Sequence, residues 1–442
     1  MEIGKRHSHY REIETLSDFG QPTPKLRHNS LSMIDDTRHL HLTAALTTLV
    51  LVGSVFGQTK IPALGVGWSN ILVPLGGLGL MFLHRVNLSP ILDRYRALFL
   101  LAGVLGVWAL IAAIAGWDPA RSIRWLIKVG GWCTVFVGGA AACRKPPHAW
   151  ALVRALWFCL VVLALGGIAE SLAPDNPLWL VFRSEHSLSI QPRAASFLGW
   201  PNQFGLIMAA GVFFNEWLGA RGIVNRWAGA FVRVLLVTQL AQSGSRNAYL
   251  AFAGTLAWSF VTRSLDRRRA LAAAAAFAIA VVVLPVASLQ AGLGRVWVPQ
   301  LEPRLEGQTW ELSNRGETFS LRSKIWREAA TEIVQNPLTG IGPDVFQVAV
   351  GPRVMHREGY NAHNFLLQIT VETGVIGLVL FLVSFAVLVF RRTPDSVAAL
   401  PLLVMTSGQF LDCFVHDPPT MVFCALLFAL LLGEPPEPPG VQ

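Results

Sequence analysis

The sequence predicts an all-α, polytopic integral membrane protein with about twelve transmembrane helices and one large non-cytoplasmic loop that contains an amphipathic helix. Of its 442 residues, 53% are hydrophobic and only 14% are charged, whereas soluble globular proteins carry roughly 25% charged residues. Apolar runs recur along most of the chain, and about 20 such residues cross a bilayer as a helix. No polar block is long enough to build a separate soluble domain.

The elements follow from these apolar runs. Residues 1–41 contain no apolar core followed by a small-residue cleavage site, so we expect a cytoplasmic N-terminal tail and no cleaved signal peptide. Spans are expected at 42–57, 66–83, 97–115, 124–142, 150–172, 195–218, 229–244, 247–262, 270–290, 364–390, 396–413 and 419–433. The chain therefore divides into helices 1–9 (42–290), a loop (291–362), helices 10–12 (363–433) and a cytoplasmic C-terminal tail (434–442).

The distribution of Arg and Lys predicts the orientation. With the N-terminus in the cytoplasm, every cytoplasmic loop is basic, as transmembrane topology favours. These loops are 84–96, 144–145, 221–226, 263–269 and 391–392. Arg121 and Arg124 are the main exceptions, because they fall on the opposite side. The basic residues beside apolar runs also explain the net charge of +9 without a nucleic-acid partner.

The loop 291–362 is expected to be ordered and functional. It carries eight Arg or Lys and eight Asp or Glu residues, and a loop of this length is unusual in a tightly connected protein. Within Ser320 to Gln335, Ile325, Ala329 and Ile333 recur at helical spacing beside Trp326 and Ala330, which predicts an amphipathic helix lying against the membrane or the core. All five cysteines lie in or beside predicted spans, so no disulfide framework is expected.

Three polar features meet on the non-cytoplasmic side. The first is His363-Asn364, at the start of a span, followed after nine residues by Gly374-Val375-Ile376-Gly377. A His at the water boundary can accept a proton, which a His in hydrocarbon could not do at low cost. The alternative reading is an interfacial polar residue at a helix start.

The second feature is Gln242-Ser243-Gly244-Ser245-Arg246-Asn247, between two spans that leave almost no loop. An Arg at membrane depth is kept mainly where it meets an anion or a carboxylate. A snorkelling side chain is the alternative for Arg246.

The third feature is a basic group on the loop helix. Arg322, Lys324 and Arg327 lie on it, and Arg315 lies just before the predicted start. Guanidinium groups match diphosphate oxygens because their paired donors meet two oxygens at once. Ordinary surface charge remains the alternative, above all for Lys324 and Arg327. The turn Pro337 to Pro343 follows, and its glycines are expected at least to permit tight backbone geometry.

These blocks resemble the signature of the O-antigen ligase and O-antigen polymerase family. His-Asn, nine residues and Gly-x-x-Gly form one block, and Ser-Arg at a span junction is similar to a second. Arg322-Ser323-Lys324-Ile325-Trp326, continuing to the Pro-x-x-Gly-x-Gly turn, resembles a third. They occur in the family's order between residues 242 and 377, with a weaker likeness around Ser196 to Gly205.

The resemblance implies a membrane glycosyltransferase of the bacterial inner membrane, with a periplasmic loop over its active site and a multi-pass chain whose termini are cytoplasmic. His363 would activate the acceptor hydroxyl, and Arg246 and Arg322 would hold the diphosphate of the donor, with Arg315 competing for the place of Arg322. The donor would be an undecaprenyl diphosphate-linked glycan, and the acceptor lipid A-core or another glycan.

Further expectations complete the site. Arg315, Lys324, Asn364, Ser245 and Arg193 are expected to bind substrate. No cofactor and no metal are expected, since no Asp-x-Asp pair or His/Asp cluster at the membrane face calls for a divalent ion.

Two alternatives stay open. The family signature often continues Gly-x-x-Gly into two threonines, where this chain has Leu378-Val379, so a polymerase that joins carrier-linked repeats competes with a ligase. From a different class, a flippase or another transporter of polyprenyl-linked glycans would also need many spans and a cationic cavity. Transporters more often show paired halves, and we find no such duplication.

Overall fold

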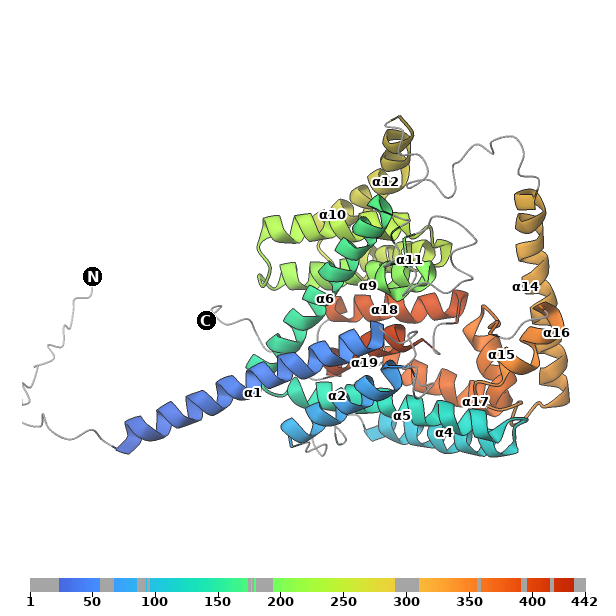
Figure 1. The fold of residues 1–442 in the computed structure, drawn as a ribbon, viewed down its shortest axis with the longest axis horizontal. Coiled ribbons are helices and arrows are strands. Elements are labelled where there is room, and N and C mark those ends of the chain that lie inside the picture. The colour runs from blue at the N-terminus through green and yellow to red at the C-terminus, as the bar shows by residue number, and fades with distance from the viewer. Residues whose placement is uncertain are drawn as a thin grey trace, which may run out of the picture.

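The computed structural model describes residues 24–55, 67–85, 93, 96–173, 176, 179, 194–290, 310–355, 359–390, 396–413 and 417–432. Helices dominate this part of the chain, and no strand occurs within it (Figure 1). The elements are α1 (Pro24–Val55), α2 (Ser69–Leu83), α4 (Arg96–Ala115), α5 (Pro119–Ala142), α6 (Pro146–Leu172), the 3-10 helix η2 (Ser196–Leu198), α9 (Pro201–Ala220), α10 (Arg226–Gln242), α11 (Arg246–Thr262), α12 (Arg267–Gln290), α14 (Trp310–Gln335), α15 (Phe346–Ala349), α16 (Gly351–Met355), α17 (Phe365–Phe390), α18 (Ser396–Leu411) and α19 (Pro418–Leu432).

The all-α prediction is confirmed, and each expected span overlaps one of these helices. Four helices among the described residues are long and apolar enough to cross a membrane: α4, α5, α6 and the Phe365–Val387 part of α17. α2 and α19 are shorter apolar helices of 15 residues each. The chain is therefore a membrane protein, while the number of twelve spans stays a prediction.

Helix packing produces one extended apolar core. α5 packs on α2, α4 and α19, α9 packs on α10 and α18, and α11 packs on α18. Side chains at the centre, such as Phe204, Phe213 and Leu156, are fully buried. Outward-facing apolar residues such as Val107 on α4 and Val379 on α17 are at least half exposed, as expected for helices that face lipid.

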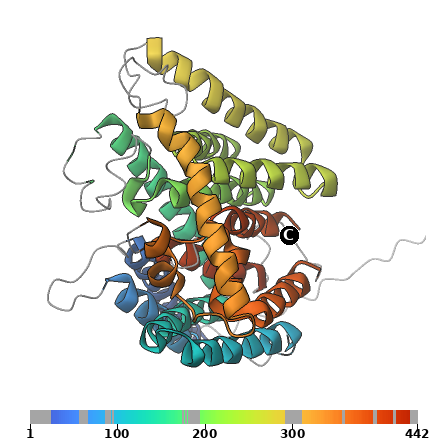
Figure 2. The same ribbon diagram turned by 90° about the vertical axis from the view of Figure 1, so that its right-hand side faces the viewer.

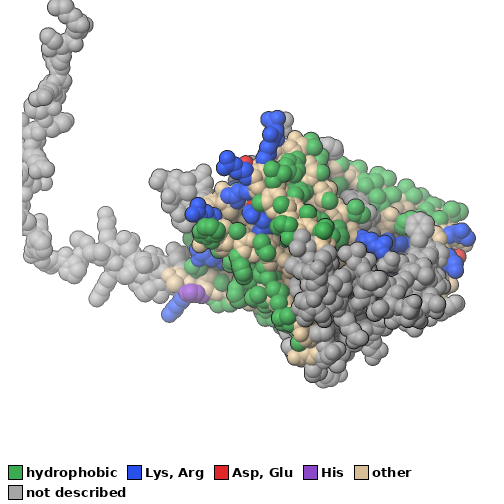
Figure 3. All heavy atoms as spheres, turned by 90° about the horizontal axis from the view of Figure 1, so that it is seen from above, with side chains coloured by type: hydrophobic (Ala, Val, Ile, Leu, Met, Phe, Trp, Pro, Cys, Tyr) green, Lys and Arg blue, Asp and Glu red, His purple; other side chains and the backbone are tan. Residues whose placement is uncertain are grey.

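The surface has the matching pattern. In Figure 3, hydrophobic side chains cover the middle of the visible face, and Lys and Arg lie toward its left and right sides. The short connections that join α9 to α10 and α11 to α12 carry Arg221, Arg226, Arg263 and Arg267. The first residues of α11 therefore lie at the opposite end of the bundle. The hydrogen bonds from Asn247 to Gly408 and between His363 and Asp412 place the last residues of α18 and the start of α17 there too.

α14 covers that opposite end. It runs across the bundle instead of along it, at the right of Figure 1 and across the front in Figure 2. Its inner face joins a small separate core with the following turn, α15 and α17, built from Ile325, Ala329, Ile341, Val345, Phe346, Val350, Ala362 and Val371. The prediction of an ordered amphipathic helix is confirmed; the helix starts earlier than expected, at Trp310, and ends as expected at Gln335.

Two elements differ in detail from the expected spans. The span expected at 195–218 is broken, since η2 is followed by Gly199 at a φ of 73° and α9 begins only at Pro201. Proline is favoured in the first turn of a helix, where its missing N–H costs nothing. α17 consists of two helical parts joined at a kink, because Gly374 has non-helical backbone angles (φ 71°, ψ −178°).

Candidate active site

His363 is placed by its backbone neighbours at the start of α17. Its φ is 50°, and a non-glycine residue persists at such an angle where the surroundings fix it. The N–H of Ala362 donates to Gln368 Oε1 over 2.9 Å, and Trp326 Nε1 of α14 donates to the Ala362 carbonyl over 2.8 Å. α14 and α17 together therefore hold the imidazole at the end of the bundle, where its side chain is 31% exposed.

A buried carboxyl group lies next to this imidazole. His363 Nδ1 is 2.9 Å from Oδ1 of Asp412, which directly follows α18, and Asp412 Oδ2 accepts a hydrogen bond from Asn202 Nδ2 over 3.1 Å. Burial opposes the charge of Asp412. The hydrogen bond and charge of His363, the N–H of Cys413 and the charge of Arg322 outweigh burial and lower the pKa of the Asp412 carboxyl.

This arrangement fixes the tautomer of the imidazole. An ionised Asp412 accepts a hydrogen bond, so the proton of neutral His363 is placed on Nδ1, and Nε2 carries the lone pair. A carboxylate that orients a His also stabilises the imidazolium that forms when the His takes a proton. The pair can therefore act as a general base through Nε2.

Asp412 and Asn202 are site residues that the sequence analysis does not single out. An ionisable residue at the end of an apolar run is the signal that points to Asp412, because such residues at membrane depth usually have a function. Asn202 follows Pro201 at the start of α9, but its partner lies 210 positions later, just after α18.

Arg322 lies on the inner side of α14. Its side chain is half-buried, whereas its neighbours Ser323 and Lys324 are exposed, and its charge lowers the pKa of Asp412. α14 therefore brings a guanidinium group within electrostatic reach of Asp412, while the binding of a diphosphate by Arg322 stays a prediction.

Arg246 is the first residue of α11 and is exposed. The N–H of Ala248 donates to Ser245 Oγ over 3.2 Å, which caps the helix. Asn247 Nδ2 donates to the Gly408 carbonyl of α18 over 2.9 Å, one turn before Asp412. The Ser-Arg block is thus attached to the helix end that presents the buried carboxyl group.

The two glycine blocks fit against each other. Ile341 N–H donates to the Val371 carbonyl over 2.9 Å, and Val375 N–H donates to the Pro337 carbonyl over 2.9 Å, so the turn after α14 pairs with the kink of α17. A Cβ on Gly374 would collide with the Leu338 carbonyl, and Gly374 has a positive φ. The spacing of these blocks therefore reflects backbone contact between the loop and α17, which sets the place of His363.

In a comparison with family models, residues 231–382 match the model described as O-antigen ligase. We name these residues the O-antigen ligase domain after the model that they match. The family predicted from the motifs is thus confirmed for this part of the chain. No curated protein matches the chain.

The O-antigen ligase domain contains Arg246, Arg322 and His363, with both glycine blocks, but not the whole site. Asn202 precedes the matched residues and Asp412 follows them. The site therefore also includes one residue that precedes the O-antigen ligase domain in the sequence and one that follows it.

The other predicted substrate-binding residues have different surroundings. Ser245 is buried and caps α11, and Asn364 Oδ1 accepts the N–H of Leu367 over 3.0 Å at the start of α17. Lys324 is exposed on α14. Arg315 belongs to α14, but its side chain lies outside the described part, as does all of Arg193. Substrate contact by these residues stays a prediction.

Arg121, one of the two exceptions to the charge pattern, has a partner near the site. Its Nε lies 3.1 Å from Asp344 Oδ2 and donates to the Asp344 carbonyl over 2.6 Å. Ser122 Oγ donates to the Pro343 carbonyl over 2.7 Å. Arg121 therefore ties the start of α5 to the turn after α14, which explains a basic residue at this end of the bundle.

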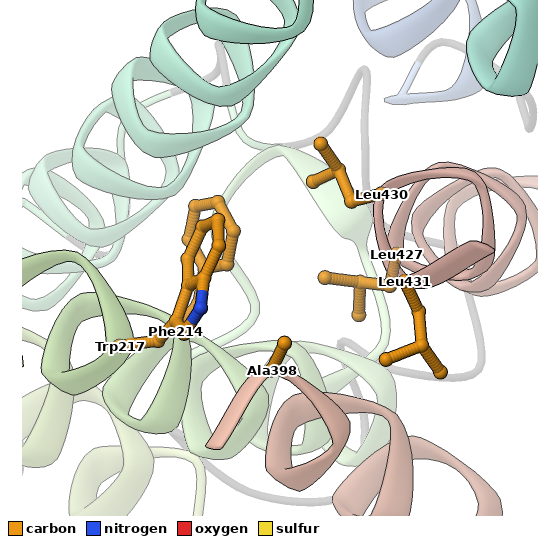
Figure 4. Close-up of a pocket in the computed structure, with 6 residues that line it drawn as sticks. All are labelled: Phe214, Trp217, Ala398, Leu427, Leu430 and Leu431. Atoms are coloured by element: carbon orange, nitrogen blue, oxygen red, sulfur yellow. The ribbon is translucent and has the colours of Figure 1, made fainter. Parts of the chain in front are cut away.

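Two other features of the described residues do not add a site. No group of three or more His, Cys, Asp or Glu residues there has the placement of metal ligands. An apolar pocket between α9, α18 and α19 lies at the opposite end of the bundle (Figure 4), lined by Phe214, Trp217, Ala398, Leu427, Leu430 and Leu431. It has no polar side chain that could take part in group transfer.

Proposed function

We propose that the protein transfers a glycan from undecaprenyl diphosphate to a lipid A-core acceptor at the periplasmic face of the bacterial inner membrane. The observation that carries this proposal is the hydrogen bond between His363 and its buried partner Asp412 at one end of a membrane bundle, where the charge of Arg322 also acts on Asp412, within and around an O-antigen ligase domain. No metal or cofactor is required.

The charge distribution supports a periplasmic site. The basic connections at Arg221 to Arg226 and Arg263 to Arg269 lie at the end of the bundle opposite the site, and basic loops favour the cytoplasm. The site then faces the periplasm, with both termini in the cytoplasm. α14 would act as the part of the periplasmic loop that covers the reacting groups.

The proposed reaction needs a base and a stabilised leaving group. The acceptor hydroxyl attacks the anomeric carbon and gives its proton to His363 Nε2, while Asp412 stabilises the resulting imidazolium. The bond between the anomeric carbon and the diphosphate oxygen breaks, and the diphosphate leaves with the electron pair. Attack opposite the leaving group inverts the anomeric centre, and NMR of the product linkage tests this, because a retained configuration would reject it.

Arg246 and Arg322 are proposed to bind the diphosphate. Each guanidinium can donate two parallel hydrogen bonds to phosphate oxygens. Arg246 is exposed, and its guanidinium has no hydrogen bond or ion pair with another described residue. Donors already held in place stabilise charge that develops on the leaving group without reorganisation.

A polymerase of the same family is the second candidate, since Leu378-Val379 replace the two threonines that often follow the ligase signature. It would use the same donor chemistry with carrier-linked glycan as acceptor. A flippase or another transporter is the candidate from a different class. Such a protein would move the glycan across the membrane without forming a glycosidic bond.

The test is reconstitution of the purified protein with polyprenyl diphosphate-linked glycan. Lipid A-core is supplied in one arm and a second carrier-linked glycan in the other, and product size is read on a gel. Transfer to lipid A-core supports the ligase, and growth on the carrier supports the polymerase. No product in either arm, where a known family member gives one, would contradict both and favour a transporter.

A further inference from the structure

Glu170, near the end of α6, holds a segment that comes from elsewhere in the chain. Its side chain is almost fully buried, at 1% exposure. One oxygen, Oε2, accepts the N–H groups of Ala195 and Ser196, both over 2.7 Å. Ser196 has a φ of 53°, and a strained residue of this kind persists only where its surroundings fix it. The two hydrogen bonds to Glu170 hold the backbone at Ser196 in this conformation.

One end of this segment leads to Arg246. The N–H of Ala194 donates to the backbone carbonyl of Gln242 over 3.2 Å. The Gln242 side chain accepts hydrogen bonds from Gln239 Nε2 over 2.5 Å and from Ser171 Oγ, next to Glu170, over 3.4 Å. The last turn of α10 is therefore bonded both to α6 and to the segment held by Glu170. Arg246 follows Gln242 by four residues.

The other end leads to His363. Ser196 begins η2, and the chain then enters α9 at Pro201. Asn202, in the first turn of α9, donates to Asp412 over 3.1 Å, and Asp412 lies 2.9 Å from His363 Nδ1. Only residues 197–201 thus separate the Ser196 backbone, which Glu170 holds, from the Asn202 side-chain amide, which holds Asp412.

We infer that Glu170 is a positioning residue for both halves of the site. Through Gln242 it fixes the position of the start of α11 and so of Arg246, which is proposed to bind the diphosphate. Through Asn202 it fixes the position of the Asp412 carboxyl group, which orients the proposed base His363. Glu170 itself touches neither substrate. The inference rests on the proposed function for its catalytic consequence, but the linkage it describes is physical and can be measured without substrate.

Two substitutions separate positioning from general packing. Glu170→Leu introduces an apolar side chain of similar size and removes the acceptor, whereas Glu170→Gln keeps one carbonyl oxygen for the two N–H groups. Leu172→Ala is the matched control, because Leu172 lies on the same turn of α6 and is 71% exposed. Each variant is made in the full-length protein, and its thermal unfolding is measured in detergent.

Hydrogen exchange reads the linkage directly. Glu170→Leu is expected to speed exchange in peptides that cover residues 194–202 and 242–248, while Glu170→Gln and Leu172→Ala exchange as wild type. In the transfer assay, kcat of Glu170→Leu is expected to fall about 100-fold, the cost of a displacement of about 1 Å in a site. Glu170→Gln is expected to recover most of that loss.

The outcomes are distinct. Wild-type exchange in both regions of Glu170→Leu would overturn the inference, as would unchanged transfer in a variant with faster exchange. Equal losses in the Leu and Gln variants, with lowered unfolding temperatures, would assign Glu170 to packing and also overturn it. If the wild type itself transfers glycan to neither acceptor, the proposed function fails, and the exchange measurement alone decides whether Glu170 links the two regions.

Discussion

Replacement of Asp412 by Asn tests the acid–base pair, because the geometry gives the new side chain two unfavourable orientations. Asp412 uses Oδ1 for His363 and Oδ2 for Asn202, at 2.9 Å and 3.1 Å. If the new amide keeps its oxygen toward His363, its NH₂ group faces the NH₂ group of Asn202. If it turns over, its NH₂ faces His363 Nδ1, the proton moves to Nε2, and Nε2 can no longer act as base.

The magnitude follows from the interactions that are lost. A hydrogen bond to a charged group contributes roughly 1.5–3 kcal/mol, and each 1.36 kcal/mol corresponds to about tenfold in rate. Loss of the His363–Asp412 bond alone therefore predicts a fall of roughly 10- to 150-fold. The wrong tautomer removes general base catalysis as well, which is worth about 100- to 10,000-fold, so a fall of at least about 100-fold is expected.

The assay compares Asp412→Asn with a double variant that also carries Asn202→Ala. The second change removes the opposing NH₂ group, so the oxygen of the introduced amide can face His363 without a clash, and part of the lost rate should return. Transfer is measured at saturating donor, with thermal unfolding as the control for folding. Wild-type transfer by Asp412→Asn, or no recovery in a folded double variant, would refute the assigned pairing.

Four further predictions follow from the described contacts. Gly374→Ala should clearly lower the unfolding temperature, because a Cβ has no room at this position and φ is positive. Gly103→Ala is the control and should not lower it, because nothing lies within 4 Å of the added Cβ. Equal effects of the two substitutions in thermal melts would contradict this prediction. Arg246→Lys should lower transfer and donor affinity at an unchanged unfolding temperature, since the exposed guanidinium supports no described contact. The lowered pKa of Asp412 stabilises the fold above its unfolded pKa of about 3.9, so the wild-type advantage in unfolding free energy over Asp412→Asn should be present above about pH 4 and shrink as the pH falls below it. Trp326→Phe should lower transfer more than stability, because its hydrogen bond fixes the backbone before His363; a stability loss without a rate loss would argue against that role.

Much of the fold could be predicted because hydropathy and helical spacing are local properties. The apolar runs at 97–115, 124–142 and 150–172 correspond to α4, α5 and α6 within a few residues. The break before Pro201 and the end of α14 at Gln335 carried local signals, a proline and an Asn-Pro pair. The early start of α14 and the kink at Gly374 did not, because tertiary contacts between the turn and α17 decide the second.

The site was predictable only where a motif carried it. His363, Arg246 and Arg322 stood in recognisable blocks, and the structure places them at one end of the bundle. Asp412, Asn202 and the buried Glu170 come from three other helices or helix ends, and their roles arise from contacts over 210 and 25 positions. Such pairings depend on which helix ends lie at the same end of the bundle, and the composition of the sequence carries no information about that.

The central claim is that the site around His363 forms a glycosidic bond. The most direct test is a single turnover in proteoliposomes loaded with polyprenyl diphosphate-linked glycan, with the transferred glycan and the released polyprenyl diphosphate measured together in wild type and in folded His363→Ala. The account predicts equal amounts of the two products in wild type and almost none in His363→Ala. Wild-type turnover by His363→Ala, or movement of the glycan across the membrane without release of polyprenyl diphosphate, would contradict it.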